Sequence, residues 1–175
     1  MLMTDPARIS DPLAAAGRLP RGSAVVFRAF GAADAARQGR QLARIARRRG
    51  LLLLVGADPN LALAIGADGV HLPERLAHRA GAILRAHPGW LVTAAAHGEV
   101  AARRARLCGA DAVVISPVFE SRSPSAGKPL GPVRFALLVR RAKIPAYALG
   151  GVDARTAVRL IGSGAVGIAA VEALA

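Results

Sequence analysis

The chain contains the stretch Ile-Gly-Ala-Asp-Gly-Val at residues 65–70 and repeats it, with changes, twice more. The related stretches are Cys-Gly-Ala-Asp-Ala-Val at residues 108–113 and Ile-Gly-Ser-Gly-Ala-Val at residues 161–166. In each copy a segment with helical spacing precedes the glycine and an apolar run follows. Glycine tolerates the left-handed backbone that ends a helix, and a short loop then begins the next strand. Three such copies indicate stacked βα units with parallel strands.

Short aliphatic runs alternate with longer helical patterns along the whole chain. The runs are apolar on successive residues, which is typical of parallel strands buried on both faces. They lie at residues 2–4, 24–27, 51–55, 69–72, 90–95, 112–115, 146–149 and 166–171. Between them, apolar residues recur at helical spacing, most clearly at residues 32–49, 99–107, 133–141 and 154–161.

Eight βα units predict a closed (β/α)₈ TIM barrel, formed as one compact domain by residues 1–175. Such barrels usually have about 200 residues or more, so the first helix, at residues 12–17, must be very short. The alternative is an open, doubly wound sheet. We favour the barrel because no Gly-x-Gly-x-x-Gly motif for dinucleotide binding follows the first strand.

The composition excludes several classes of protein. With 53% hydrophobic residues the chain is not disordered, and its single cysteine, Cys108, excludes a disulfide framework or a cysteine-rich zinc module. The longest aliphatic run, at residues 51–55, is too short to span a bilayer. The first twenty residues also lack the uninterrupted apolar core of a signal peptide. We therefore expect a soluble, cytoplasmic protein that does not bind a membrane.

The charge is strongly positive, with 24 Lys and Arg against 11 Asp and Glu, a net charge of +13. This excess is typical of proteins that bind nucleic acid or phosphorylated substrates. Basic residues recur at three- and four-residue steps in one helical segment, which predicts a solvated helix face: Arg37, Arg40, Arg44, Arg47 and Arg48. The aromatic residues are too few for a stacking platform, so we do not expect nucleic acid as the partner.

In a barrel of this kind the working residues follow the carboxyl ends of the strands. Gly150 and Gly151 follow the seventh strand and expose backbone amides, which predicts a phosphate site there. Ala169 and Ala170, after the eighth strand, would complete it. The alternative is a plain turn in which Asp153 begins the next helix as its N-cap.

Two further strand ends carry polar residues. The long loop after the sixth strand contains Ser121, Arg122 and Ser123, which could fold over an anionic ligand or lie in solvent. His71 and His97 end the fourth and fifth strands, which are neighbours in a barrel. Histidine at these positions can transfer protons near neutral pH, although a single buried histidine is more often structural.

Three stretches carry a resemblance to a known family. They are Leu-Ala-Leu-Ala-Ile-Gly-Ala-Asp-Gly-Val-His-Leu at residues 61–72, Ser-Pro-Val-Phe at residues 116–119 with Ser121 and Ser123 behind it, and Ala-Leu-Gly-Gly-Val at residues 148–152. In this order they resemble the thiamine phosphate synthase family, which includes the thiazole tautomerases called TenI. The resemblance implies a barrel that joins a hydroxymethylpyrimidine diphosphate to a thiazole phosphate and releases pyrophosphate with the help of Mg²⁺.

The resemblance also implies roles for single residues. Arg28 matches the arginine of the family's second strand, and His97 matches the histidine that moves a proton in the tautomerase branch. The family's Asn-Asp after the third strand and its aspartate after the fourth, which hold Mg²⁺, are absent here. Asp58 and Glu74 are the remaining candidate metal ligands, so we expect Mg²⁺ to bind weakly.

Three functions are compatible with this sequence. The first is a thiamine-biosynthesis barrel that resembles thiamine phosphate synthase and has altered metal and diphosphate residues. The second is a tautomerase that uses His97, and the third is a barrel that binds a phosphorylated ligand without turnover. The missing carboxylates favour the second and third, while His97 favours the second over the third.

Overall fold

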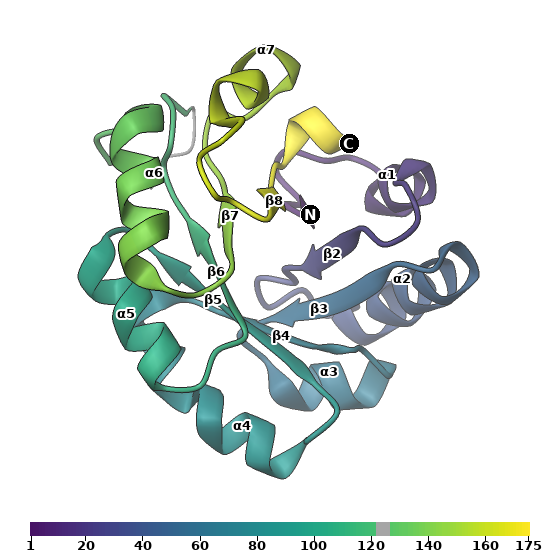
Figure 1. Ribbon diagram of the computed structural model, residues 1–175. Coiled ribbons are helices and arrows are strands. Elements are labelled where there is room, and N and C mark those ends of the chain that lie inside the picture. The colour runs from purple at the N-terminus through teal and green to yellow at the C-terminus, as the bar shows by residue number, and fades with distance from the viewer. Residues whose placement is uncertain (122–126) are drawn as a thin grey trace.

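The chain folds into a sheet of parallel strands surrounded by helices (Figure 1). The structure is a computed structural model that describes residues 1–121 and 127–175. In the described part, eight strands lie in one sheet in the order of the sequence. Every neighbouring pair is parallel. The strands are β1 (Leu2–Met3), β2 (Ala24–Phe27), β3 (Leu52–Gly56), β4 (Gly69–Leu72), β5 (Leu91–Ala96), β6 (Ala112–Ile115), β7 (Ala146–Ala148) and β8 (Gly167–Ile168).

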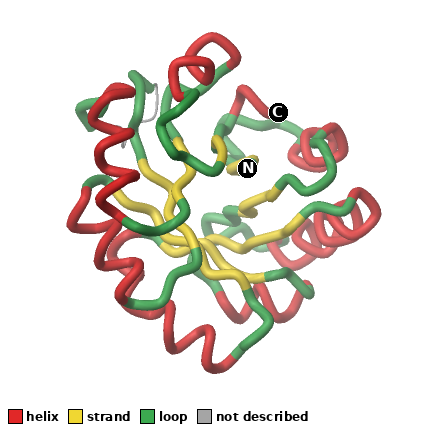
Figure 2. Tube along the Cα trace, in the orientation of Figure 1, coloured by secondary structure: helices red, strands yellow, loops and turns green. Residues whose placement is uncertain are grey.

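Helices connect the strands and cover the outer face of the sheet (Figure 2). The α-helices are α1 (Pro12–Arg18), α2 (Ala35–Arg49), α3 (Pro59–Ile65), α4 (Ala80–Ala86), α5 (Glu99–Leu107), α6 (Gly131–Ala142) and α7 (Ala154–Ala157). Three short 3₁₀ helices accompany them: η1 (Glu74–Arg79), η2 (Val158–Leu160) and η3 (Glu172–Leu174). The predicted alternation of strands and helices is therefore confirmed. Within the described residues, no helix has the length and apolar character needed to cross a membrane.

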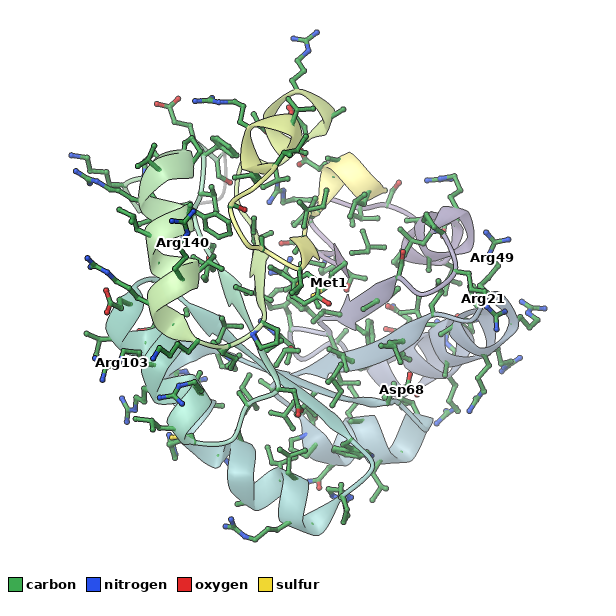
Figure 3. All side chains as sticks on the ribbon, in the orientation of Figure 1. Met1, Arg21, Arg49, Asp68, Arg103 and Arg140 are labelled. Atoms are coloured by element: carbon green, nitrogen blue, oxygen red, sulfur yellow. The ribbon has the colours of Figure 1, made fainter. Side chains whose placement is uncertain are left out.

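The core lies inside the sheet and between the sheet and its helices. Leu54, Val70 and Val92, on three consecutive strands, are completely buried. Helix α2 buries Leu42 and Ala43 against the sheet and leaves its arginines exposed, as the spacing predicted. Arg103 of α5 and Arg140 of α6, both labelled in Figure 3, are exposed as well.

The repeated stretches connect the beginnings of neighbouring strands. The Asp68 carboxylate accepts a hydrogen bond from the backbone N–H of Leu53 at 2.7 Å, which joins the start of β4 to β3. The Asp111 carboxylate accepts one from the backbone N–H of Val92 at 2.8 Å, which joins the start of β6 to β5. The third copy has Gly164 in place of the aspartate, so it carries no carboxylate at this position. The preceding residue, Ser163, accepts locally from the backbone N–H of Ala165 at 3.3 Å.

The glycines of these stretches have the predicted backbone conformation. Gly66, Gly109 and Gly162 have φ values of 65°, 90° and 78°. Gly69 is required for a different reason. A Cβ atom at this position would lie 1.9 Å from the carbonyl oxygen of Leu91, on the adjacent strand. Only glycine lets β4 approach β5 this closely.

The two edges of the sheet meet at a narrow seam. A single parallel bridge joins Leu2 to Ala170, just after β8. It is made by the hydrogen bonds from Met3 N to Ala170 O at 2.9 Å and from Ala170 N to Met1 O at 3.1 Å. Since β1 and β8 do not pair along their length in the described chain, the structure is a curled sheet that stays open along this seam apart from one bridge. The predicted closed barrel is thus right in its strand order and wrong in its complete closure.

Candidate functional site

A cavity of about 620 Å³ opens at the carboxyl ends of the strands. We call it the central cavity, and its walls include Arg28, His71, His97, Asp58 and Gly150. The sequence predicted all five as site residues, and the fold brings them to one mouth. This is the end of the fold at which TIM-type proteins carry out their chemistry.

Arg28 is held in place by the end of β1. Its Nε donates to the backbone carbonyl of Thr4 at 2.6 Å, and its guanidinium lies 3.3 Å from the Asp5 carboxylate. The Arg28 backbone N–H also donates to the Thr4 hydroxyl at 2.9 Å. Burial lowers the pKa of the guanidinium from its ordinary value, and the Asp5 charge opposes this shift. The site therefore contains a fixed, partly buried positive charge.

His71 is a buried residue of β4 that borders the central cavity. Its Nδ1 atom lies 2.9 Å from the Thr93 hydroxyl on β5. Burial and, to a smaller extent, the charge of Arg28 lower the pKa of His71 to about 4. At neutral pH the ring is uncharged, so it can form hydrogen bonds with a ligand and cannot neutralise a phosphate. The sequence also makes His71 a candidate for binding the phosphorylated substrate, and such a contact would be a hydrogen bond to an uncharged ring.

His97 follows β5 and forms a pair with Glu74, the first residue of η1. One carboxylate oxygen of Glu74, Oε2, lies 2.7 Å from His97 Nδ1 and accepts from the His97 backbone N–H at 2.8 Å. The two side chains are 56% and 41% exposed, so solvent reaches this pair. His97 also borders the central cavity, so its ring is accessible to a ligand bound there.

The two candidate metal ligands do not fit a Mg²⁺ site. Asp58 is the N-cap of α3, where its carboxylate accepts from the backbone N–H of Leu61 at 2.9 Å. Glu74 is bound to His97, as described above. Across residues 1–121 and 127–175, no three metal-binding side chains come close enough to share an ion. The sequence-based assignment of these carboxylates to Mg²⁺ is therefore replaced by a helix cap and a histidine partner.

The glycine pair after β7 packs against the loop that follows β6. Gly150 and Gly151 have φ values of 93° and 63°. A Cβ atom on Gly150 would lie 2.8 Å from Pro117 Cα, and one on Gly151 would lie 2.2 Å from the Glu120 carbonyl oxygen. The Gly150 carbonyl also accepts from the Phe119 backbone N–H at 2.9 Å. Both glycines are therefore needed to seat one loop on the other.

Beside these loops lies a second cavity of about 1020 Å³, which we call the loop cavity. Gly150 and Gly151 line it, and within the described chain the N–H groups of Gly151 and Val152 have no hydrogen-bond acceptor. Asp153 caps α7 by accepting from the backbone N–H groups of Arg155 and Thr156, which was the alternative to a phosphate site at this turn. Gly151 and Val152 therefore precede the helix and line a cavity large enough for a phosphate ester.

The other residues predicted for the phosphate site do not all lie where a phosphate could contact them. Ala169 N donates to Ala148 O at 2.8 Å and Ala170 N donates to Met1 O at 3.1 Å, so neither amide is available to a phosphate. Ser121 lines both cavities. Arg122 and Ser123 lie outside the described residues.

Basic side chains that the sequence analysis did not assign also surround the loop cavity. They include Arg134 of α6 and Arg159 of η2, whose guanidinium carbon lies 5.1 Å from the centre of the Phe119 ring. Glu172, whose charge would repel a phosphate, pairs with Arg8 at 2.9 Å. Arg134 lies on α6, after the β6 loop, and Arg159 lies on η2, after α7, but only the folded chain shows that both helices border the cavity.

Together, the fold and the site define a TIM-type protein with a glycine-rich loop after β7 and a histidine at the mouth. The family model for thiamine monophosphate synthase matches residues 4–174 of the chain. The chain therefore belongs to the thiamine monophosphate synthase family, as its sequence motifs predicted.

Individual relatives agree with this family. The chain is 33% identical over 183 residues to a thiamine-phosphate synthase of Alcanivorax borkumensis, covering 98% of this chain and 82% of that protein. It is 37% identical over 129 residues to the thiamine biosynthesis bifunctional protein ThiM/ThiE of Symbiobacterium thermophilum, covering 73% of this chain but only 27% of that protein. It also spans 64% of relatives from Aquifex aeolicus and Geobacter sulfurreducens.

A solved structure has the same fold. Thiamine phosphate pyrophosphorylase from Pyrococcus furiosus superimposes with a TM-score of 0.81 over 97% of this chain and 83% of that one. Its sequence identity is 23%, so this likeness concerns the fold alone.

Proposed function

We propose that this chain is an enzyme of thiamine biosynthesis that binds a thiazole phosphate at the carboxyl ends of its strands. The observation that carries the proposal is that one cavity unites Arg28, His71, His97 and Gly150. These groups supply a fixed positive charge, a neutral hydrogen-bonding ring, a proton-transfer group and the start of an anion-binding loop. Such a set suits a small, phosphorylated heterocycle.

The phosphate of this ligand would bind between the two cavities. The N–H groups of Gly151 and Val152 would donate to its oxygens, and Arg159 and Lys128, which line the loop cavity, would neutralise its charge. The heterocycle would then extend into the central cavity, because Gly150 and Ser121 border both spaces. Ala169 and Ala170 would serve as the wall beside the phosphate rather than as donors.

The first candidate reaction is the one named in the family, formation of thiamine phosphate. In that reaction the pyrimidine diphosphate loses pyrophosphate and the thiazole nitrogen attacks the resulting cation, so no protein nucleophile is required. The leaving group needs strong neutralisation of its charge. Arg28 supplies one positive charge, but Asp58 and Glu74 are engaged elsewhere. We therefore expect slow turnover at best.

The second candidate is a thiazole tautomerase, and the His97–Glu74 pair favours it. His97 Nε2 would take a proton from a carbon of the non-aromatic thiazole phosphate, and the ring would return a proton elsewhere in the same molecule. Bonding electrons then shift to form the aromatic ring, and the product is an isomer of the substrate. This reaction needs no metal, so it does not depend on the replaced carboxylates.

The candidates are separated by parallel assays of the purified protein. One mixture holds pyrimidine diphosphate, thiazole phosphate and Mg²⁺ and is assayed for thiamine phosphate. Another holds the non-aromatic thiazole phosphate and is followed by the ultraviolet absorbance of the aromatic product. Turnover in either mixture supports an enzyme of thiamine biosynthesis. Binding of thiazole phosphate in calorimetry without turnover in either would support a binding protein, and absence of binding would refute the proposed ligand.

We also propose that residues 1–175 act as one domain. One continuous cluster of buried apolar residues extends from Leu2 to Val171, and the Leu2–Ala170 bridge joins the sheet edges. We place its activity in the cytoplasm, because charged phosphate esters do not readily cross membranes.

A further inference from the structure

Glu74 and His97 are connected by two hydrogen bonds that share one oxygen atom. Glu74 Oε2 accepts from the His97 backbone N–H at 2.8 Å and lies 2.7 Å from the Nδ1 atom of the same residue. The backbone N–H and the Nδ1 atom of His97 both contact this one oxygen, and the two contacts together restrict the rotation of the imidazole ring. The pair also ties the loop after β4 to the loop after β5.

The chemistry of this contact determines which ring nitrogen of His97 carries the proton. An ionised carboxylate has only acceptor atoms, so the Nδ1 atom beside it must carry hydrogen. A neutral imidazole has one protonated nitrogen, and Nε2 is therefore the bare, basic one. With Nδ1 directed at Glu74, Nε2 is the nitrogen available to a ligand in the central cavity.

The contacts around Glu74 are consistent with a role in holding His97. Pro73 precedes it and fixes the backbone, and Glu74 then begins η1. The nearby acid Glu99 pairs with Arg141 at 3.3 Å instead of with His97. Asp58 is occupied as the cap of α3. Among the described carboxylates, Glu74 is thus the one that contacts His97.

We infer that Glu74 is a positioning residue, which holds His97 as the Nδ1–H tautomer and stabilises the imidazolium formed when Nε2 takes a proton from the ligand. This inference rests on the proposed function, in which His97 transfers the proton. Glu74 itself does not touch the substrate. Its role resembles that of the carboxylate in a catalytic triad, where loss of the carboxylate produces the wrong tautomer.

The tautomer can be measured without any substrate. Nitrogen-15 NMR of the ¹⁵N-histidine-labelled protein above neutral pH distinguishes Nδ1–H from Nε2–H. We expect Nδ1–H at His97 in the unmodified protein and in Glu99→Gln, the matched control. In Glu74→Ala we expect the Nε2–H form that predominates in free histidine. Glu74→Gln retains an oxygen that can accept from Nδ1, so its tautomer should be unchanged.

Turnover then tests the function of the pair. For isomerisation of the thiazole phosphate, Glu74→Ala should lower kcat about tenfold or more, as loss of part of a general-base contribution. KM should stay within about twofold, because the phosphate is bound elsewhere. Glu74→Gln should recover part of kcat, since it keeps the ring oriented but lacks the charge.

The outcomes separate the two proposals. If His97 has the Nε2–H form in the unmodified protein, or keeps Nδ1–H in Glu74→Ala, the positioning role is wrong whether or not the protein turns over. An unchanged kcat in folded Glu74→Ala would also overturn it. If the unmodified protein does not isomerise the thiazole phosphate, tautomerase function fails, while the NMR result still decides whether Glu74 sets the state of His97.

Discussion

The Nδ1 atom of His71 lies 2.9 Å from the Thr93 hydroxyl, and these two buried residues occupy directly paired positions on β4 and β5. A neutral ring satisfies this contact within the sheet, whereas a protonated ring would bring an unpaired charge into the core. The folded protein therefore favours the uncharged form of His71.

Acid should destabilise the protein through His71. Its pKa is lowered from 6.5 to about 4 in the folded protein, so the unfolded chain binds the additional proton between these values. The free energy of unfolding should fall as pH decreases from about 7 to 4, by up to about 3 kcal/mol from this residue. Urea denaturation at several pH values measures it. The decrease should be smaller in His71→Gln, and an equal decrease in both proteins would contradict the assignment.

Gly69→Ala should strongly destabilise the fold. The added Cβ atom would lie 1.9 Å from the Leu91 carbonyl oxygen, and strand β5 cannot move away without breaking its pairing with β6. We expect a loss of about 3 kcal/mol or more, or failure to fold. Gly89→Ala is the control, because its Cβ would meet no atom within 4 Å. Thermal unfolding should show a large difference between the two variants.

Arg159→Ala should weaken phosphate binding. Arg159 lines the loop cavity and has an exposed guanidinium, so its loss should reduce affinity for thiazole phosphate about tenfold with the fold intact. Arg155→Ala removes an arginine of α7 that is also exposed and does not line the cavity. Calorimetry that finds the same loss for both variants would indicate only a general effect of charge. Gly151→Asp is unsuitable here, because its Cβ would collide with the Glu120 carbonyl.

His97→Ala should abolish isomerisation of the thiazole phosphate and leave its binding unchanged. The ring borders the central cavity, whereas the proposed phosphate donors lie on the loop after β7. His78→Ala, on the exposed side of η1, is the matched control. Rate and affinity should be measured on the same preparations. If His97→Ala isomerised the thiazole phosphate as fast as the unmodified protein, another group would have to move the proton.

Asp58→Ala should lower stability and leave metal binding unaffected. Its carboxylate caps α3, and loss of such a cap costs about 1 kcal/mol. Asp58→Asn, which can still accept a hydrogen bond at the cap, should recover most of this. Titration with Mg²⁺ should give the same weak heat for all three proteins. A Mg²⁺ affinity that disappears in Asp58→Ala would restore this residue as a metal ligand.

Local chemistry made most of the fold predictable from the sequence. The glycines at residues 66, 109 and 162 follow helix ends as expected, because glycine tolerates a positive φ wherever it occurs in a sequence. The seam was less predictable. The eighth apolar run was read as residues 166–171, but β8 contains only Gly167–Ile168, since pairing there depends on how far the whole sheet curls.

The site was predictable as a set of positions and not as a set of contacts. Strand ends correctly indicated that Arg28, His71 and His97 would meet. The sequence could not show that Glu74 binds His97, because residues 23 positions apart meet only through the packing of β4 against β5. Nor could it show that the Ala169 amide is already used by Ala148, which depends on the register between β7 and β8.

The carboxylates of Asp68 and Asp111 fasten the amino-terminal beginnings of their strands, at the end of the sheet opposite the cavities. The residues that align the strands and the residues that line the cavities therefore lie at opposite ends of the sheet. Residues at the mouth can be substituted without breaking the hydrogen bonds of Asp68 and Asp111 that align the strands. Substitutions at the mouth, among them changes to the carboxylates near His97, should therefore alter the chemistry of the site without disturbing the scaffold that aligns the strands.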